Sequence, residues 1–178
     1  MAIRESVLSL VAAGDHRLMR RVNRWRPPRW LRLCALWATR AGDGWLWYAL
    51  GLAILLAGDA QRGQALAGGA LAAVSSVVCF QFMKRLANRR RPCCIEPHGW
   101  ADLLPPDRFS FPSGHSMTAF AVATSVVLAY PALLGILLAC ALSVAASRIL
   151  LGMHFLSDVL VGSVLGVLLG YAAYAVVH

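Results

Sequence analysis

After residue 44, the chain consists of long apolar stretches separated by short polar ones. Such stretches predict membrane-spanning helices, since a helix needs about 20 mostly apolar residues to cross a bilayer. The pattern predicts five spans, at about residues 45–58, 65–83, 116–130, 132–151 and 159–177. The first is short for a bilayer. We therefore expect an all-α integral membrane bundle of about five transmembrane helices.

Glycines recur inside the second and fifth predicted spans, at Gly68, Gly69, Gly162, Gly166 and Gly170. In lipid, small residues allow two helix backbones to approach closely. These positions therefore predict the sites of closest contact between helices.

Residues 1–43 are basic and amphipathic instead of uniformly apolar. Arginines recur at helical three- and four-residue spacings from Arg17 to Arg24, and apolar side chains lie between them. Pro27 and Pro28 interrupt the pattern, which then resumes. Because a span follows directly, the pattern favours one or two helices lying in the lipid headgroup layer over an ordinary solvated helix.

Composition supports a membrane protein with an anionic partner. Hydrophobic residues make up 59% of the chain, which exceeds the 45–50% apolar content of soluble domains. The mean hydropathy is +0.63. Its net charge is +9, and the charge lies in two blocks between apolar runs. That distribution favours anionic lipids and phosphorylated substrates and argues against nucleic acid. The five cysteines form no C-x-x-C pair, and we expect unpaired thiols.

Two polar connections contain most of the candidate catalytic and binding residues. Residues 84–115 join the second and third spans, and residues 152–158 join the fourth and fifth. Counting crossings places both on the same side of the membrane, where they can meet. Charged groups at membrane depth are costly, which makes them candidates for function.

A phosphate ester fits the cations in these connections. Lys84, Arg91 and Arg148 supply positive charge for its oxygens. Ser113 and Gly114 open the third span, where backbone N–H groups and the helix dipole favour an anion. These five residues are the predicted phosphate pocket.

Two histidines are candidates for the bond-breaking steps. Asp158 follows His154 by four residues, so a helix would bring this carboxylate to the same face as the imidazole. The carboxylate would keep one ring nitrogen protonated and leave the other to attack phosphorus. His115 would protonate the leaving oxygen. No carboxylate cluster suits a divalent metal, and we predict no cofactor.

Three patterns carry a family resemblance: K-x6-R-P at residues 84–92, P-S-G-H at 112–115 and S-R-x5-H-x3-D at 147–158. In this order they resemble the three signatures of the type 2 phosphatidic acid phosphatase superfamily, and every specified position matches. The resemblance implies a metal-independent membrane lipid phosphatase that forms a phosphohistidine. It implies the same roles for the residues above: His154 as nucleophile, Asp158 as its orienting carboxylate, His115 as general acid and the five pocket residues around the phosphate.

We therefore expect two parts, an interfacial segment at 1–43 and a membrane phosphatase domain at 44–178 whose motifs lie in 84–158. The predicted substrate is phosphatidic acid, phosphatidylglycerophosphate or a polyprenyl (di)phosphate. A lipid phosphotransferase and a non-catalytic lipid-binding or transport protein are the alternatives. Outside the motif positions, arginines are expected to lie at the surface or against headgroups: Arg85, Arg89, Arg90 and Arg108.

The expected location is the bacterial inner membrane, with several spans. All Lys and Arg residues except Arg62 lie on the side of the predicted site, which favours a cytoplasmic site by the positive-inside rule. Bacterial members of the family usually act at the periplasmic face. Many have six spans where this chain shows five, so the resemblance leaves the face open.

Overall fold

The computed structural model describes residues 2–96 and 108–178, with the backbone alone for residues 2–8. The described part is helical and has no strand beyond an isolated bridge between Arg90 and Phe109. Its elements are α1 (Ala2–Arg24), α2 (Arg29–Arg40), the kinked turn η1 (Ala41–Trp45), α3 (Leu46–Ala57), α4 (Arg62–Ala87), the 3-10 turn η2 (Pro92–Cys94), α5 (Gly114–Ala129), the 3-10 turn η3 (Pro131–Leu133), α6 (Leu134–Leu150) and α7 (Leu156–Val177).

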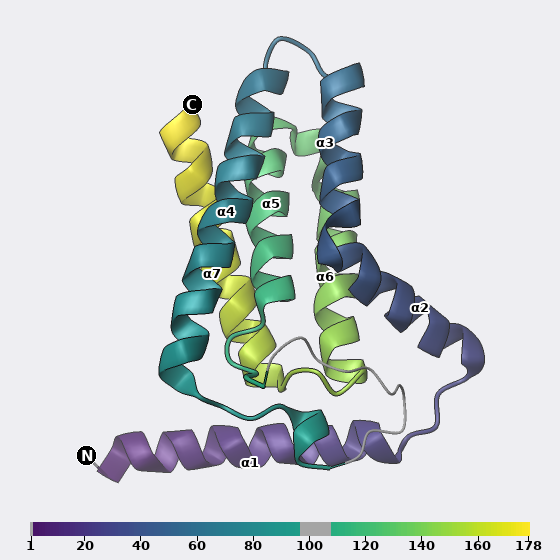
Figure 1. The fold of residues 1–178 in the computed structure, drawn as a ribbon, viewed down its shortest axis with the longest axis vertical. Coiled ribbons are helices and arrows are strands. Elements are labelled where there is room, and N and C mark those ends of the chain that lie inside the picture. Colours follow the sequence, from purple (N-terminus) through teal and green to yellow (C-terminus); the bar gives the residue numbers. More distant parts are fainter. Residues whose placement is uncertain (1, 97–107) are drawn as a thin grey trace.

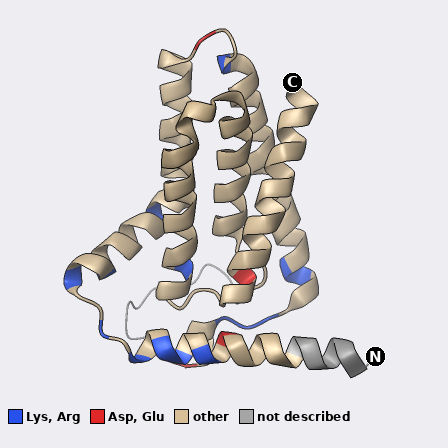
Figure 2. Ribbon diagram, turned by 180° about the vertical axis from the view of Figure 1, so that it is seen from behind, with Lys and Arg blue, Asp and Glu red and all other residues tan. Residues whose placement is uncertain are grey.

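Helices α3 to α7 form a bundle, and α1 lies across its lower end (Figure 1). Helix α2 leads obliquely from the end of α1 to α3. The described parts of the connection after α4 and the connection after α6 both lie at the lower end, as the crossing count predicts; residues 97–107 of the first lie outside the described residues. Most of the coloured basic positions also lie toward this end, and Arg62 begins α4 at the other end (Figure 2).

The described residues contain three helical stretches that are long and apolar enough to cross a membrane: Arg62–Ala87, Pro131–Leu150 and Leu156–Val177. Helix α5 is apolar but has 16 residues, and α3 has 12. Large apolar side chains such as Leu56, Val78 and Leu168 are exposed on the bundle. Such exposure is expected where the surrounding medium is lipid, and the predicted helical membrane fold is confirmed.

Helix α7 packs directly on the backbone of α5 through its glycines. A Cβ atom on Gly166 would lie 2.4 Å from the Met117 carbonyl oxygen, and one on Gly170 would lie 2.3 Å from that of Ala121. Gly162 makes the same kind of contact with the Ser113 carbonyl at the start of α5. The predicted close contact is confirmed, and it fixes the start of α7 against the start of α5.

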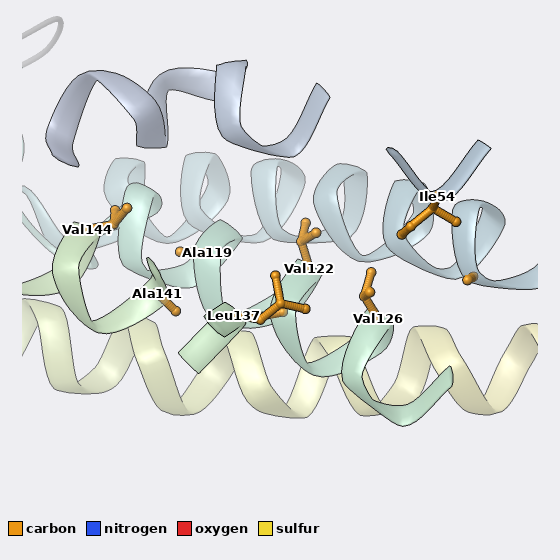
Figure 3. Close-up of a cluster of buried hydrophobic side chains, with 9 residues drawn as sticks. Ile54, Ala119, Val122, Val126, Leu137, Ala141 and Val144 are labelled. Carbon is orange, nitrogen blue, oxygen red and sulfur yellow. The ribbon is translucent and has the colours of Figure 1, made fainter. Parts of the chain in front are cut away.

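The main apolar core lies between α3, α5 and α6 (Figure 3). Ile54, Val122, Val126, Leu137 and Val144 are buried together there. This cluster holds the helices whose lower ends carry the polar connections.

The N-terminal helices break where the prolines predict. Helix α1 ends at Arg24 and α2 begins at Arg29, directly after Pro28. Helix α1 buries Met19 and Val22 and leaves its arginines exposed: Arg17, Arg20, Arg21 and Arg24. This division confirms an amphipathic helix, and its place in the headgroup layer stays a prediction. All five cysteines have free thiols, also as predicted.

Candidate active site

Three segments far apart in the chain are tied together by backbone hydrogen bonds at the lower end of the bundle. The Ser113 amide donates to the Asp158 carbonyl at 3.0 Å, and the Cys93 amide donates to the Gly152 carbonyl at 3.1 Å. The Ser110 amide donates to the carbonyl of Arg89 at 2.7 Å. These bonds hold the segment after α4, the start of α5 and the α6–α7 loop in one assembly.

His154 lies in the α6–α7 loop and is 2% exposed. Its Nδ1 lies 2.6 Å from the Ser110 carbonyl oxygen, which can only accept, so Nδ1 carries the proton and donates. In the neutral ring, Nε2 then keeps its lone pair, and this atom lies 3.1 Å from Nη1 of Arg91. The ring therefore presents a nucleophilic nitrogen directly beside a guanidinium.

The pKa of His154 is held well below its ordinary value of 6.5. Burial is the largest cause, because it disfavours the charged imidazolium. The positive charges of Arg148, Arg91 and Lys84 act in the same direction. The imidazole is consequently neutral at physiological pH, which is the form that can attack phosphorus.

Asp158 stabilises the histidine loop without bonding to the imidazole. Its Oδ2 lies 3.8 Å from His154 Nδ1, beyond hydrogen-bond distance, and accepts the Phe155 amide at 2.8 Å. Its Oδ1 accepts from Arg89 at 2.7 Å. The partner that the i, i+4 spacing suggested for the imidazole is thus replaced by the Ser110 carbonyl. A backbone acceptor gives no signal in the sequence.

The three predicted cations reach this region from three elements. Arg91 is 1% exposed and also donates to the Met153 carbonyl at 3.0 Å. Arg148, 3% exposed near the end of α6, donates to the Thr39 hydroxyl. The Lys84 ammonium lies 5.2 Å from the centre of the Phe80 ring. Two buried guanidiniums beside a neutral imidazole form a region suited to an anion.

Ser113 and Gly114 have structural duties at the start of α5. The Ser113 hydroxyl oxygen accepts the Ser116 amide at 3.4 Å as the helix cap and lies 2.9 Å from the Ser116 hydroxyl. A Cβ on Gly114 would lie 3.0 Å from the Phe80 ring. Both residues thus fix the first turn of α5 against its neighbours, and their contact with phosphate stays a prediction.

The sequence model of the PAP2 superfamily matches residues 65–178. The chain belongs to the PAP2 superfamily.

Two curated relatives are phosphatases. The chain is 38% identical to a decaprenylphosphoryl-5-phosphoribose phosphatase of Mycobacterium tuberculosis over 127 residues, 71% of this chain and 68% of that protein. It is 32% identical to a lipid A 1-phosphatase of Rhizobium etli over 97 residues, 52% of this chain and 42% of that protein.

Two solved structures are similar over most of this PAP2 chain. The transmembrane PAP2-type phosphatidylglycerolphosphate phosphatase from Bacillus subtilis has a TM-score of 0.72 at 26% identity, covering 94% of this chain and 86% of that one. LpxE from Aquifex aeolicus has a TM-score of 0.73 at 28% identity, covering 89% and 93%. The predicted family is confirmed, and so is the predicted class of enzyme, a membrane lipid phosphatase.

The prediction that Arg89 is a surface or headgroup residue is wrong. Its guanidinium donates to Asp158 and to Asp15 of α1, each at 2.7 Å, and lies 4.2 Å from the centre of the Phe155 ring. Asp15 also accepts the Ser157 amide at 3.0 Å. Arg89 is drawn inward because α1 crosses beneath the bundle and brings a second carboxylate to it. Its neighbours Arg85 and Arg90 are exposed, as is Arg108, in line with the prediction.

A further carboxylate at the site was not predicted. Asp43 of η1 contacts His115, the histidine of the second PAP2 signature, with 2.5 Å between Oδ1 and Nε2. Both Asp15 and Asp43 lie before residue 65, where the match to the PAP2 model begins. One sequence signal pointed to Asp43: it is an acidic residue in a basic segment, directly before a membrane span.

Proposed function

We propose that this protein hydrolyses the phosphate ester of a membrane lipid through a covalent phosphohistidine on His154. The supporting observation is the state of the buried imidazole, with Nδ1–H donating to the Ser110 carbonyl and Nε2 facing Arg91. A phosphoryl group between the ring and the cations would meet a lone pair on one side and positive charge on the other.

In the first step, the Nε2 lone pair of His154 forms a bond to phosphorus while the bond from phosphorus to the lipid oxygen breaks. His115 gives its proton to that oxygen, and the lipid leaves as an alcohol. In the second step, a water molecule attacks phosphorus and loses a proton to His115. The bond between nitrogen and phosphorus breaks, which releases inorganic phosphate and restores both histidines.

Charge on the phosphoryl oxygens is balanced in this scheme by Lys84, Arg91 and Arg148, with the first turn of α5 at Ser113 and Gly114 closing the pocket. Asp158 positions the nucleophile indirectly, because it anchors the Phe155 amide and Arg89. These cations supply the charge that a divalent metal supplies in other phosphatases. We expect the reaction to continue in a chelator.

The substrate class follows from the relatives, whose names describe a polyprenyl-linked phosphosugar, lipid A and phosphatidylglycerolphosphate. We propose a lipid phosphomonoester or diphosphate: phosphatidic acid, phosphatidylglycerophosphate, a polyprenyl (di)phosphate or a polyprenyl phosphosugar. A phosphotransferase is the second candidate, because the same phosphohistidine can pass its phosphate to an acceptor other than water. Product that depends on the acceptor would separate it from the hydrolase.

The site would operate at the surface of the bacterial inner membrane, with α1 and α2 of the segment 1–43 in the headgroup layer and residues 44–178 as the phosphatase domain. The concentration of basic residues at the site's end of the bundle favours the cytoplasmic face. The reporter fusion described below tests this orientation.

The test is phosphate release by the purified protein in detergent micelles with excess chelator, across the four lipid classes named above. We expect His154→Ala to abolish release and to lose an acid-labile, alkali-stable phosphate label. His178→Ala is the matched control, because His178 lies exposed at the C-terminal end of α7. Release by His154→Ala at the wild-type rate would refute the mechanism.

A further inference from the structure

The contact between Asp43 and His115 is short and joins residues 72 positions apart in the chain. His115 Nε2 lies 2.5 Å from Asp43 Oδ1, and a carboxylate can only accept, so the ring nitrogen donates. The His115 side chain is 22% exposed and that of Asp43 is 55% exposed. Both side chains are therefore partly accessible from outside the protein.

The backbone conformation around Asp43 places its carboxylate next to the His115 ring. Residues 41–45 form a kink between α2 and α3, in which the backbone leaves helical geometry at Gly44. Gly44 has a φ angle of +130°, which residues with a Cβ atom rarely adopt. A Cβ on Gly42 would lie 2.9 Å from Val144 and 3.2 Å from the His115 ring. The two glycines flanking Asp43 therefore permit the turn and its close approach to His115.

The charges facing His115 come from three elements. Asp43 of η1 contacts it directly, while Arg148 of α6 and Lys84 of α4 are the cations close enough to act on it. These cations are required for phosphate, yet they oppose a protonated imidazole. A general acid among them needs a compensating negative charge, and Asp43 is the carboxylate hydrogen-bonded to this ring.

We propose that Asp43 is a positioning residue for the general acid: it accepts a hydrogen bond from Nε2–H of His115, orients the ring and favours the imidazolium, whose other ring nitrogen protonates the leaving lipid oxygen. This inference rests on the proposed function, in which the proton moves from His115 to the oxygen as the bond to phosphorus breaks. Asp43 itself stays ionised and does not contact the reacting atoms. The carboxylate orients and stabilises the imidazole in the manner of an orienting aspartate in a catalytic triad.

The test compares two esters that differ in their need for an acid. An alkyl phosphate, such as a short-chain phosphatidic acid, leaves as a strongly basic alkoxide, whereas p-nitrophenyl phosphate leaves as a stable phenolate. Because kcat/KM reports steps up to departure of the leaving group, it is measured for both. We expect Asp43→Asn to lower kcat/KM about ten- to a hundredfold for the alkyl ester and less than about threefold for the aryl ester. Asp43→Glu, which keeps the charge, should recover part of the loss.

The pH profile adds a readout that a merely structural role would not move. Loss of the carboxylate disfavours the imidazolium, so the alkaline limb of kcat/KM for the alkyl ester should move to lower pH in Asp43→Asn. In a His115→Ala background, Asp43→Asn should have no further effect on either ester. This double variant separates an action through His115 from a direct one.

Several results would overturn the inference while leaving the proposed function intact. One is an equal loss of kcat/KM for both esters in Asp43→Asn, and another is an unchanged kcat/KM for the alkyl ester. A third is a higher kcat/KM in Asp43→Asn, which would mean that the contact with His115 has to break before substrate can react. A wild-type protein that releases phosphate from none of the four proposed lipid classes, or a fully active His154→Ala variant, would instead refute the proposed function itself.

Discussion

Arg89 lies between two buried carboxylates, so its removal should destabilise the protein strongly although it lies outside the motifs. Asp158 is fully buried, the Asp15 side chain is 3% exposed and Arg89 is 27% exposed. Substitution Arg89→Met keeps much of the aliphatic stem and removes the guanidinium that lies over the Phe155 ring. Both carboxylates would then be buried without their cation. Breaking a buried pair by removing one partner costs about 3–5 kcal/mol.

The assay is thermal unfolding in detergent micelles, followed by circular dichroism. At about 2–4 °C per kcal/mol for a chain of this size, the melting temperature should fall by about 6–20 °C. Arg85→Met, four residues earlier in the last turn of α4, is the matched control, because Arg85 is exposed and should change stability by no more than about 0.5 kcal/mol. Activity should fall together with stability, since Asp158 holds the amide that follows His154.

A double-variant cycle isolates the electrostatic cause. Asp15→Asn removes one of the stranded charges, so Arg89→Met should cost less in that background than in the wild type. We expect a coupling of about 1–3 kcal/mol, within the range for residues in direct contact. A melting temperature for Arg89→Met within the error of Arg85→Met, or strict additivity with Asp15→Asn, would refute the account of Arg89 as a buried bridge.

Three further predictions follow from the packing, the buried imidazole and the distribution of charge. Gly166→Val should destabilise the protein by about 1–3 kcal/mol in the same assay, because its Cβ would meet the Met117 carbonyl, whereas Gly135→Val has open space and should be near neutral. The depressed pKa of His154 means that the unfolded chain takes up a proton below about pH 6.5 that the folded protein does not. Stability should therefore fall as pH drops from 8 to 5, and less steeply in His154→Gln; equal slopes would contradict a neutral buried ring. A periplasm-dependent reporter fused to the C-terminus should be active if the site is cytoplasmic, because the C-terminus lies at the opposite end of the bundle from the site (Figure 1), and a silent but expressed fusion would reverse the orientation.

Sequence reasoning succeeded where a property is local or periodic. The lengths of the apolar runs predicted the bundle, and the number of crossings predicted that the two polar connections lie at one end. The glycines of α7 predicted a close helix contact, which the structure forms with α5. The spacing of the signatures predicted that Arg91 lies near His154. The contact forms because both residues follow helix ends that the fold places together. These inferences need only the geometry of a helix and the thickness of a bilayer.

Sequence reasoning failed where a contact depends on how segments far apart in the chain pack together. Asp15 lies 74 residues from Arg89, and no periodic pattern connects them. The acceptor for the His154 ring is a backbone carbonyl, which any residue at position 110 would supply. The spacing of His154 and Asp158 was correctly noted, but residue 155 is extended and α7 begins only at Leu156, so the carboxylate faces the backbone amide instead of the ring.

The N-terminal segment is connected to both histidines, although the PAP2 match begins after it. Asp15 reaches the loop of His154 through Arg89 and Ser157, and Asp43 contacts His115 directly. The predicted boundary at 43/44 falls inside η1, a turn that continues α2 into α3. The burial of Asp15 against the loop of His154 and the approach of Asp43 to His115 give this segment a structural role beyond its amphipathic surface. Residues 1–43 therefore complete the structure that holds His154 and His115, and their attachment to the membrane surface stays a prediction.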